Sequence, residues 1–412
     1  MSPRLRSLLV LLIGLLLGAT LSWMWWSRSA SAPADTVPID RPPAQSPGSA
    51  RSLAPSVESR LAEIFDKVQA DYVDEVPADR LVDAALRAMV GTLDSYSAYL
   101  DRREYEDLRR AAAGNYPGIG IEVIAEGETI KVLRTLADSP ALRAGIRKDD
   151  VILRIDEEPV GRDVMAAIEQ MRGPPGSLVR LTLRRADTEE VVNVALERAR
   201  VAVQSVSSRV LAPAVAYVRI ASFSETTAQE FERQLVTLQQ PGPLRLVVLD
   251  LRNNPGGVFE AAVAIADTLL ESGVIVSGVG RSQSAQFRLT ATPGEMLAGV
   301  PLAVLVDRGS ASAAEILAGA LKDQRRARIF GQRTYGKGSV QTVVPLADGH
   351  ALKLTTSRYA TPSGTLINER GIEPDVMLPA SPPREEAPES DPQVIAAWRN
   401  MLRASSNPAP RT

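Results

Sequence analysis

Cysteine is absent from this sequence, and histidine occurs once among its 412 residues. The lack of thiols excludes disulfides, a cysteine-linked lipid anchor and thiolate catalysis. A single imidazole is too few for a histidine-rich metal site, and we expect no metal and no other cofactor. Nucleophilic catalysis in such a chain would use other groups, for example a serine hydroxyl whose proton is taken by a neutral lysine.

An excess of charge of one sign is also lacking. The chain has 47 basic and 49 acidic side chains, a formal net charge of −2, and 4% aromatic residues. Nucleic-acid binding relies on basic patches with aromatic side chains between them. No such stripe occurs, so we expect no nucleic-acid partner. The hydrophobic content of 45% and the length suit two or three packed domains.

The N-terminus has the pattern of an export signal. Arg4 and Arg6 precede an apolar run at 8–26 that ends in a group of tryptophans. Secretory apolar regions are about 7–15 residues long, whereas about 20 apolar residues span a bilayer, and tryptophan is typical of the membrane interface. We favour an inner-membrane anchor, with a cleaved signal peptide as the alternative because the small residues at 30–32 suit a signal peptidase. In either case the body is exported to the periplasm.

Helical periodicity begins after a linker rich in proline, serine and alanine at 33–55. Apolar residues such as Val57, Leu61 and Ile64 recur at spacings of three and four. Pro77 separates two predicted helices, and a third covers about 103–110. These helices either form a cap packed on the adjoining domain or serve as a dimerisation element, and the pattern leaves both alternatives open.

Between 116 and 200 the periodicity changes to that of strands, and the order of motifs resembles a PDZ domain. The motifs are GIGI at 118–121, SPALRAGIRKDDVILRID at 139–156 and RGPPGSLVRLTLRR at 172–185. A PDZ domain adds a peptide as an extra strand, and loop amides hold the terminal carboxylate. The resemblance implies a peptide-binding loop formed by Gly118, Ile119, Gly120 and Ile121.

From 201 to 379 strands alternate with helices, which is typical of an α/β layer over a largely parallel sheet. The apolar run at 244–251 suits a buried parallel strand. It leads through Gly256 and Gly257 into an apolar helix at 258–270. This Gly-Gly turn is a plausible donor of backbone amides to an oxyanion.

Two short motifs later in this region carry candidate chemistry. Ser312 lies between a predicted strand at 302–307 and a predicted helix at 313–321, where backbone amides and the helix dipole favour a developing negative charge. The same serine could be only an N-cap. Lys337 lies between two glycines, in a turn where a surface lysine would be ordinary.

Taken in order, the motifs are more specific. After the PDZ-like block, this order resembles the carboxyl-terminal processing peptidases, which are serine–lysine proteases, over roughly 56–379. The motifs that carry the resemblance are DLRNNPGG at 250–257, VLVDRGSASAAEILAGALKD at 304–323, YGKGSVQTVVPL at 335–346, LKLTTSRYATPSG at 352–364 and GIEPDV at 371–376.

The resemblance implies a role for each matching residue. Ser312 corresponds to the family's nucleophile, Lys337 to its base and Gln341 to the side chain that orients the base. The oxyanion donors would be the amides of Gly257 and Ala313, with the Gly-Gly turn uncertain by one residue. The chain departs from the family signature in having alanine at position 314.

Three other polar side chains have simpler interpretations. We expect Glu315 to support the first turn of its helix and Asp323 to pair with a basic residue. His350 is predicted to lie in a hairpin turn. It is the only imidazole available to a serine–histidine hydrolase of small esters, which we consider as an alternative.

The implied activity is that of a serine endopeptidase of the cell envelope. Its PDZ domain would bind the free C-termini of protein or peptide substrates and gate the active site. Envelope proteins that maintain the cell wall, an activating adaptor, the membrane and further copies of the chain are the implied partners. The alternative from another class is a non-catalytic PDZ scaffold that only binds peptides.

After 379 the chain is rich in proline and glutamate, and a short amphipathic stretch at 394–402 could dock on the body or on a partner. The predicted fold class is multidomain α+β. Its predicted parts are a signal or anchor at 1–32, a linker at 33–55, a helical region at 56–115, a PDZ domain at 116–200, a protease core at 201–379 and a tail with a short helix at 380–412.

Overall fold

The computed structural model describes residues 55–126, 129–161 and 163–406. The apolar run at 8–26 lies outside these residues, and so does the predicted anchor or signal peptide. None of the helices in the described ranges is long and apolar enough to cross a membrane.

The N-terminal region contains the three predicted helices: α2 (Pro55–Asp71), α3 (Ala78–Gly91) and α4 (Arg102–Ala113). Asp101 caps α4 through the backbone N–H of Glu104. A short strand that the periodicity did not predict, β1 (Ala98–Leu100), lies between α3 and α4.

Helix α2 leaves its apolar face uncovered. The side chains of Leu61 and Ile64 are 55% and 57% exposed. Packing on the rest of the described chain therefore does not bury this face, and the dimerisation element remains a prediction.

The PDZ region is an antiparallel sheet closed by two short helices. The strand order is β3-β4-β5-β7-β8, with β6 beside β5, so β3 is an edge strand. Its core contains the side chains of Ile119, Ile130 and Leu181 among others. The elements are β3 (Ile121–Glu126), β4 (Thr129–Thr135), α5 (Pro140–Arg143), β5 (Val151–Ile155), β6 (Glu158–Pro159), α6 (Val164–Met171), β7 (Leu178–Arg184) and β8 (Val191–Glu197). A separate pair, β2 (Asn115–Gly118) with β9 (Ala199–Ala202), flanks this sheet in the sequence.

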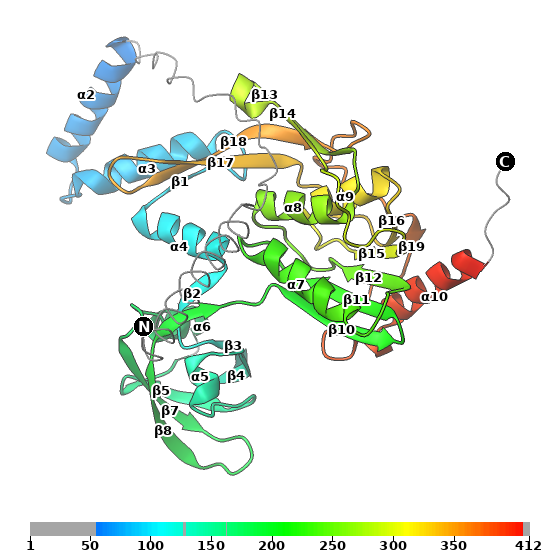
Figure 1. Ribbon diagram of the computed structural model, residues 1–412. Coiled ribbons are helices and arrows are strands. Elements are labelled where there is room, and N and C mark those ends of the chain that lie inside the picture. Colours follow the sequence, from blue (N-terminus) through cyan, green and yellow to red (C-terminus); the bar gives the residue numbers. More distant parts are fainter. Residues whose placement is uncertain (1–54, 127–128, 162, 407–412) are drawn as a thin grey trace, which may run out of the picture. The chain divides into compact units, whose positions relative to one another are not determined.

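The second region is built on a six-stranded sheet of order β10-β11-β12-β15-β16-β19. All its pairs are parallel except β10–β11, as the apolar runs predict. Figure 1 shows helices α7, α8 and α9 beside this sheet. The elements are β10 (Val206–Ala212), β11 (Val215–Ile220), α7 (Thr227–Gln239), β12 (Leu246–Asp250), α8 (Phe259–Leu269), β15 (Leu302–Val306), α9 (Ala313–Asp323), β16 (Ala327–Gly331) and β19 (Val376–Met377).

Five further strands form a separate antiparallel sheet, of order β1-β18-β13-β14 with β17 beside β18. The strand pattern did not show that these strands form a sheet separate from the parallel one. The short turn after β17 forces an antiparallel hairpin, because a parallel pair needs a longer crossover. The strands are β13 (Val274–Gly280), β14 (Phe287–Thr290), β17 (Ser339–Pro345) and β18 (Ala351–Ala360).

The C-terminal segment docks on the body, which decides between the two possibilities that its sequence left open. Helix α10 (Pro392–Ser406) buries Val394 and Ala397 against Tyr217 and Phe330 of the parallel sheet. Helices α7, α8 and α9 pack in a different core cluster. The predicted multidomain α+β fold, with a PDZ domain and an α/β core, is confirmed.

Candidate active site

Ser312 lies at the predicted strand–helix junction, directly before α9. It has φ 56° and ψ −116°, a backbone conformation that non-glycine residues seldom adopt and that is most common at functional sites. The residue is partly exposed, whereas the rest of α9 is largely buried. The junction thus presents a serine hydroxyl at the surface of a rigid, buried helix.

The Gly-Gly turn lies against this serine. A side chain at Gly256 would come within 2.8 Å of Ser312 Cβ, and one at Gly257 within 2.0 Å of the Phe223 carbonyl oxygen. Gly256 and Gly257 have φ of 98° and 138°, so both steric space and backbone conformation require glycine here.

The amides of this turn differ in their partners. The Gly256 N–H donates to Asn254 Oδ1 at 2.8 Å. Within the described part of the chain, the N–H groups of Gly257 and Ala313 make no hydrogen bond. Gly257 is exposed. The sequence left the register of this turn open by one residue either way. The N–H groups of both neighbours have partners, since that of Val258 donates to the Phe223 carbonyl at 2.8 Å.

Lys337 lies partly buried in the turn before β17. Its Nζ is 4.8 Å from the centroid of the Tyr96 ring. No described residue forms a hydrogen bond or ion pair with this ammonium. Burial lowers the pKa of Lys337, the positive charge of Lys353 lowers it further, and Glu315 acts in the opposite direction.

Gln341 contacts other groups than the predicted lysine. Its Nε2 donates to Ser339 Oγ at 2.8 Å and to Thr355 Oγ1 at 3.3 Å. Among the residues that the structure describes, no hydrogen bond joins Gln341 to Lys337. Gln341 therefore lies in β17, shortly after the turn that carries Lys337, and does not hydrogen-bond the lysine ammonium.

Glu315 connects the two motifs, a role that sequence reasoning missed. This carboxylate is fully buried. One oxygen accepts hydrogen bonds from the backbone N–H of Ser312 at 2.8 Å and of Lys337 at 2.9 Å. The other accepts from the Thr334 hydroxyl at 2.5 Å and the Gly336 N–H at 2.7 Å. The available signal was a glutamate three residues after a serine, in a helix whose other residues are apolar up to Leu321.

The electrostatics of Glu315 have opposing contributions. Burial raises the pKa of Glu315 above its ordinary value, and the four donated hydrogen bonds offset part of this rise. Because all four partners donate, the arrangement fits a carboxylate, which only accepts. One buried side chain thus holds the backbone of both candidate catalytic residues.

Tyr359 is a second connector. Its side chain is 1% exposed, and its hydroxyl donates to the carbonyl of Lys337 while also contacting the side chain of Ser312. Burial raises the pKa of Tyr359, so the phenol stays neutral and able to donate.

The N-terminal region also reaches the site, which its helical pattern did not indicate. Asp94 accepts hydrogen bonds from the N–H groups of Tyr96 and Ser97 and from the Thr355 hydroxyl. Strand β1 pairs with β18, so this turn is joined to the hairpin after Lys337. Tyr96, the aromatic neighbour of Lys337, therefore comes from outside the 201–379 region.

Asp323 and His350, two other polar candidates, lie among groups that give them a structural role. Asp323 accepts a hydrogen bond from the Ser363 N–H and forms no ion pair with a described residue, so its predicted basic partner was wrong; a turn lies over this end of α9 instead. His350 lies in the β17–β18 turn, stacked on Tyr99. Strand β17 separates it from Lys337 by roughly 20 Å at the usual rise per residue.

The predicted peptide-binding loop borders a cavity of about 380 Å³. Gly118, Ile119, Gly120 and Ile121 line it at the start of the edge strand β3, and Ile168 and Met171 of α6 also contribute. An edge strand has free backbone groups to which a peptide can pair.

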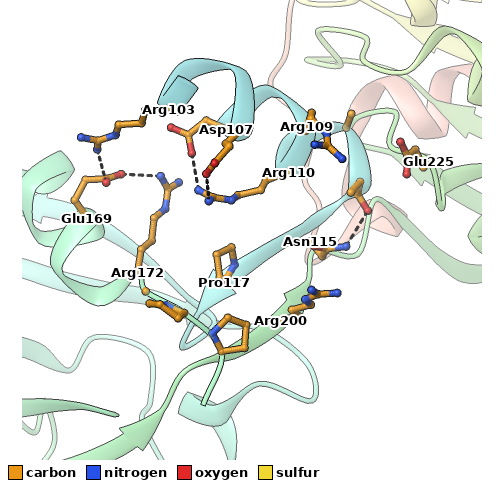
Figure 2. A pocket seen from close by; sticks show the side chains of 16 residues that line it. Arg103, Asp107, Arg109, Arg110, Asn115, Pro117, Glu169, Arg172, Arg200 and Glu225 are labelled. Atoms are coloured by element: carbon orange, nitrogen blue, oxygen red, sulfur yellow. Dashed lines mark hydrogen bonds and ion pairs between the residues drawn. The ribbon is translucent and has the colours of Figure 1, made fainter. Parts of the chain in front are cut away.

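A second cavity, of about 880 Å³, lies beside α4 and contains none of the predicted site residues. Figure 2 shows that several of its charged side chains pair with each other. Glu169 of α6 binds both Arg103 of α4 and Arg172, and Arg110 binds Asp107. Of these pairs, Arg103–Glu169 connects the N-terminal region with the PDZ region.

Comparison with known proteins matches both regions. The model of peptidase family S41 matches residues 214–378, and the PDZ domain model matches residues 117–196. The carboxy-terminal-processing protease of Bartonella bacilliformis is 39% identical over 324 residues, which cover 78% of this chain and 74% of that protein. The carboxy-terminal processing protease CtpA of Bacillus subtilis is 32% identical over 327 residues, covering 79% and 70%.

Solved structures agree at the level of the fold. An S41 protease from Bacteroides fragilis aligns with a TM-score of 0.52 at 16% identity, covering 87% of this chain and 99% of that one. The sequence relatives carry the assignment further than this structural likeness does. The chain therefore belongs to peptidase family S41, as a serine protease of the carboxy-terminal processing type.

Proposed function

We propose that this protease cleaves its substrates with Ser312 as nucleophile and Lys337 as general base. The observation that carries the proposal is the buried carboxylate of Glu315, which binds the backbone N–H of both residues. Two loops far apart in the sequence are thereby held by one side chain. A shared anchor of this kind is what a nucleophile and its base require.

The reaction follows from the chemistry of these groups. Neutral Lys337 takes the proton of the Ser312 hydroxyl as Oγ attacks the scissile carbonyl carbon. The N–H groups of Gly257 and Ala313 then bind the oxyanion. The amine product leaves with a proton from Lys337, and water activated by the same lysine hydrolyses the acyl-enzyme. The lowered pKa of Lys337 increases the fraction that is neutral near pH 7.

We further propose that Gln341 orients the base once a substrate is bound. In the structure its amide nitrogen donates to Ser339 and Thr355, which leaves the amide oxygen to accept a hydrogen bond.

The PDZ groove supports binding of substrate C-termini. A peptide strand added to β3 would place its carboxylate at the 118–121 loop and its last side chain in the apolar cavity. The ion pair of α4 with α6 offers a route by which groove occupancy gates the active site. An activating adaptor and assembly into homo-oligomers fit the same scheme.

The arginines and apolar run before residue 27 support export, so that the substrates would be periplasmic or cell-wall-maintaining envelope proteins. Anchoring to the inner membrane through the same segment is part of this proposal.

The test compares Ser312→Ala and Lys337→Ala with the parent chain on a protein substrate that has a free C-terminus. Proton transfer by a positioned base contributes about 10²–10⁴-fold, so both variants should lose most turnover while unfolding at the temperature of the parent. Fluorophosphonate labelling should be lost in Ser312→Ala. Lys148→Ala, an exposed lysine of the PDZ region, is the matched control.

The alternatives predict other results. A non-catalytic scaffold would bind the peptide equally well in all variants and cleave it in none, the parent included. A serine–histidine ester hydrolase would retain activity in Lys337→Ala and lose it in His350→Ala. Undiminished cleavage of the protein substrate by Lys337→Ala would contradict the serine–lysine mechanism.

A further inference from the structure

The chain continues past the S41 match, which ends at residue 378, and this continuation reaches a buried arginine next to the active site. Arg252 lies shortly after β12 and begins the turn that contains Gly257. Its side chain is fully buried, and so is Asp391, which directly precedes α10. The two form an ion pair of 3.0 Å between Arg252 Nη2 and Asp391 Oδ2.

The guanidinium is held from two sides. Asp250 accepts hydrogen bonds from Nε and Nη2 at 2.9 and 2.6 Å. From the other side, Asp391 accepts from Nη1 and Nη2, and Gln393 Oε1 accepts from Nη1 at 3.1 Å. Paired contacts with planar carboxylates fix a guanidinium in orientation as well as position.

Two carboxylates of the C-terminal segment contribute to the charges of this cluster. Arg219 lies 3.7 Å from Asp250, donates to the carbonyl of Arg252 at 3.0 Å and pairs with the exposed Glu385 at 2.8 Å. Arg252 pairs with Asp250 and Asp391, which are fully buried. Loss of the Asp391 charge would leave the buried guanidinium of Arg252 to share Asp250 with Arg219, which is unfavourable in the interior.

The turn that begins at Arg252 sets the position of the Gly257 amide and of the loop that precedes Ser312. Asn254 holds the Gly256 N–H through its side chain, and its carbonyl accepts from the Ala311 N–H at 2.9 Å. The Asn253 N–H donates to Asp307 at 2.9 Å. A shift of Arg252 would therefore move the Gly257 amide relative to Ser312.

Asp391 is itself rigidly held. Its carboxylate also accepts from the backbone N–H groups of Gln393 and Arg384 at 2.8 and 3.0 Å. Burial alone would raise the pKa of Asp391, but the hydrogen bonds from Arg252 and the backbone lower it, so it is charged at neutral pH. The start of α10 and the buried arginine share one carboxylate.

We propose that Asp391 is a positioning residue for catalysis, which neutralises and orients Arg252 and thereby fixes the turn that presents the Gly257 amide to the oxyanion. This inference rests on the proposed role of Gly257. It makes the C-terminal segment a part of the catalytic apparatus, beyond the residues that define the family match.

The experiment measures kcat and KM of full-length Asp391→Asn on a fluorogenic peptide with a free C-terminus, well below its unfolding temperature. Removal of an oxyanion donor lowers kcat by about 10²–10³, so a displaced donor should cost about 10- to 100-fold. KM should change little. A peptide boronic acid, which forms a tetrahedral adduct with the serine, should bind more weakly by a similar factor, whereas the C-terminal product peptide should bind the PDZ groove unchanged.

Glu389→Gln is the matched control, because it removes the same charge from an exposed side chain of the same segment. If Asp391→Asn does not fold, Gln393→Leu tests the inference instead, because it removes one hydrogen bond to Arg252. This variant should lower both kcat and the affinity for the boronic acid, by a smaller factor than Asp391→Asn. Unchanged kcat in the folded variant, or reduced kcat with full boronate affinity, would overturn the inference. Retained cleavage by Ser312→Ala would instead overturn the proposed mechanism on which it rests.

Discussion

The carboxylates at the active site and those beside α4 are bound in opposite ways. Glu315 is fully buried and accepts four hydrogen bonds, three of them from backbone N–H groups. Glu169 is 37% exposed in its side chain and is paired only with the ends of long arginine side chains. Buried polar groups are costly to disturb, whereas exposed ion pairs contribute little. The protein thus combines a rigidly held proposed catalytic centre with an easily broken link to its PDZ region.

The largest loss in the free energy of unfolding is expected from Glu315→Gln. An amide can accept with only one of its two terminal atoms, so the other would face two donors that lose their partner. Leaving a buried donor unsatisfied costs about 1–3 kcal/mol, and two such losses should lower the free energy of unfolding by about 2–6 kcal/mol. Denaturant unfolding measures the stability of the variant, and active-site labelling of the same sample measures whether Ser312 and Lys337 remain aligned.

The matched control for this change is Glu386→Gln, an exposed glutamate of the C-terminal segment. It should unfold and label like the parent. A Glu315→Gln protein with parental stability and full turnover would show that the shared carboxylate is not what holds the two loops together.

An intermediate effect is expected from the two neighbours of Lys337, and the two should act in opposite directions. The charge of Lys353 lowers the pKa of Lys337, so Lys353→Met should raise it and move the rise of kcat/KM to higher pH. The Tyr96 ring favours the charged ammonium by about 0.5–2 kcal/mol, so Tyr96→Leu should move the rise to lower pH. The base acts only when neutral, so activity is lost as pH falls through the pKa of Lys337 in both variants.

This pair of variants is tested by kcat/KM profiles, which report the free enzyme. Lys322 lies near the C-terminal end of α9, where its ammonium pairs with Asp375. Lys322→Met should leave the profile unchanged. Shifts of the same sign in Lys353→Met and Tyr96→Leu would contradict the assignment of Lys337 as the titrating base.

Much of this arrangement was accessible from the sequence, because the informative patterns are local. The period-3.6 and apolar runs predicted the helices and the parallel strands, and the motif order placed Ser312 and Lys337 in a protease. Glu315 was visible as a residue of the first helical turn, but its contacts with Thr334, Gly336 and Lys337 depend on how two distant loops meet.

The features that were missed share a long sequence separation. Tyr96 reaches Lys337 because β1 pairs with β18, and a three-residue strand has too little periodicity to predict such a pairing. Asp391 lies in a segment whose composition indicates a tail, and its buried partner Arg252 belongs to a motif that the sequence assigns to a turn. Propensity and pattern describe segments, whereas buried ion pairs join them.

The smallest effect is expected where the charges are exposed. Glu169→Gln removes the partner of Arg103 and Arg172, and exposed pairs contribute about 0.2–1 kcal/mol each, so the unfolding temperature should change by little. If these pairs help gate the site, cleavage of a protein whose C-terminus occupies the PDZ groove should change by a few-fold, and its dependence on salt should weaken, since salt already screens such pairs. A short peptide without a free C-terminus should be cleaved as by the parent. Glu190→Gln, which changes an exposed glutamate elsewhere in the PDZ region, is the control. If both substitutions change the salt dependence of cleavage equally, the ion pairs beside α4 do not gate the active site.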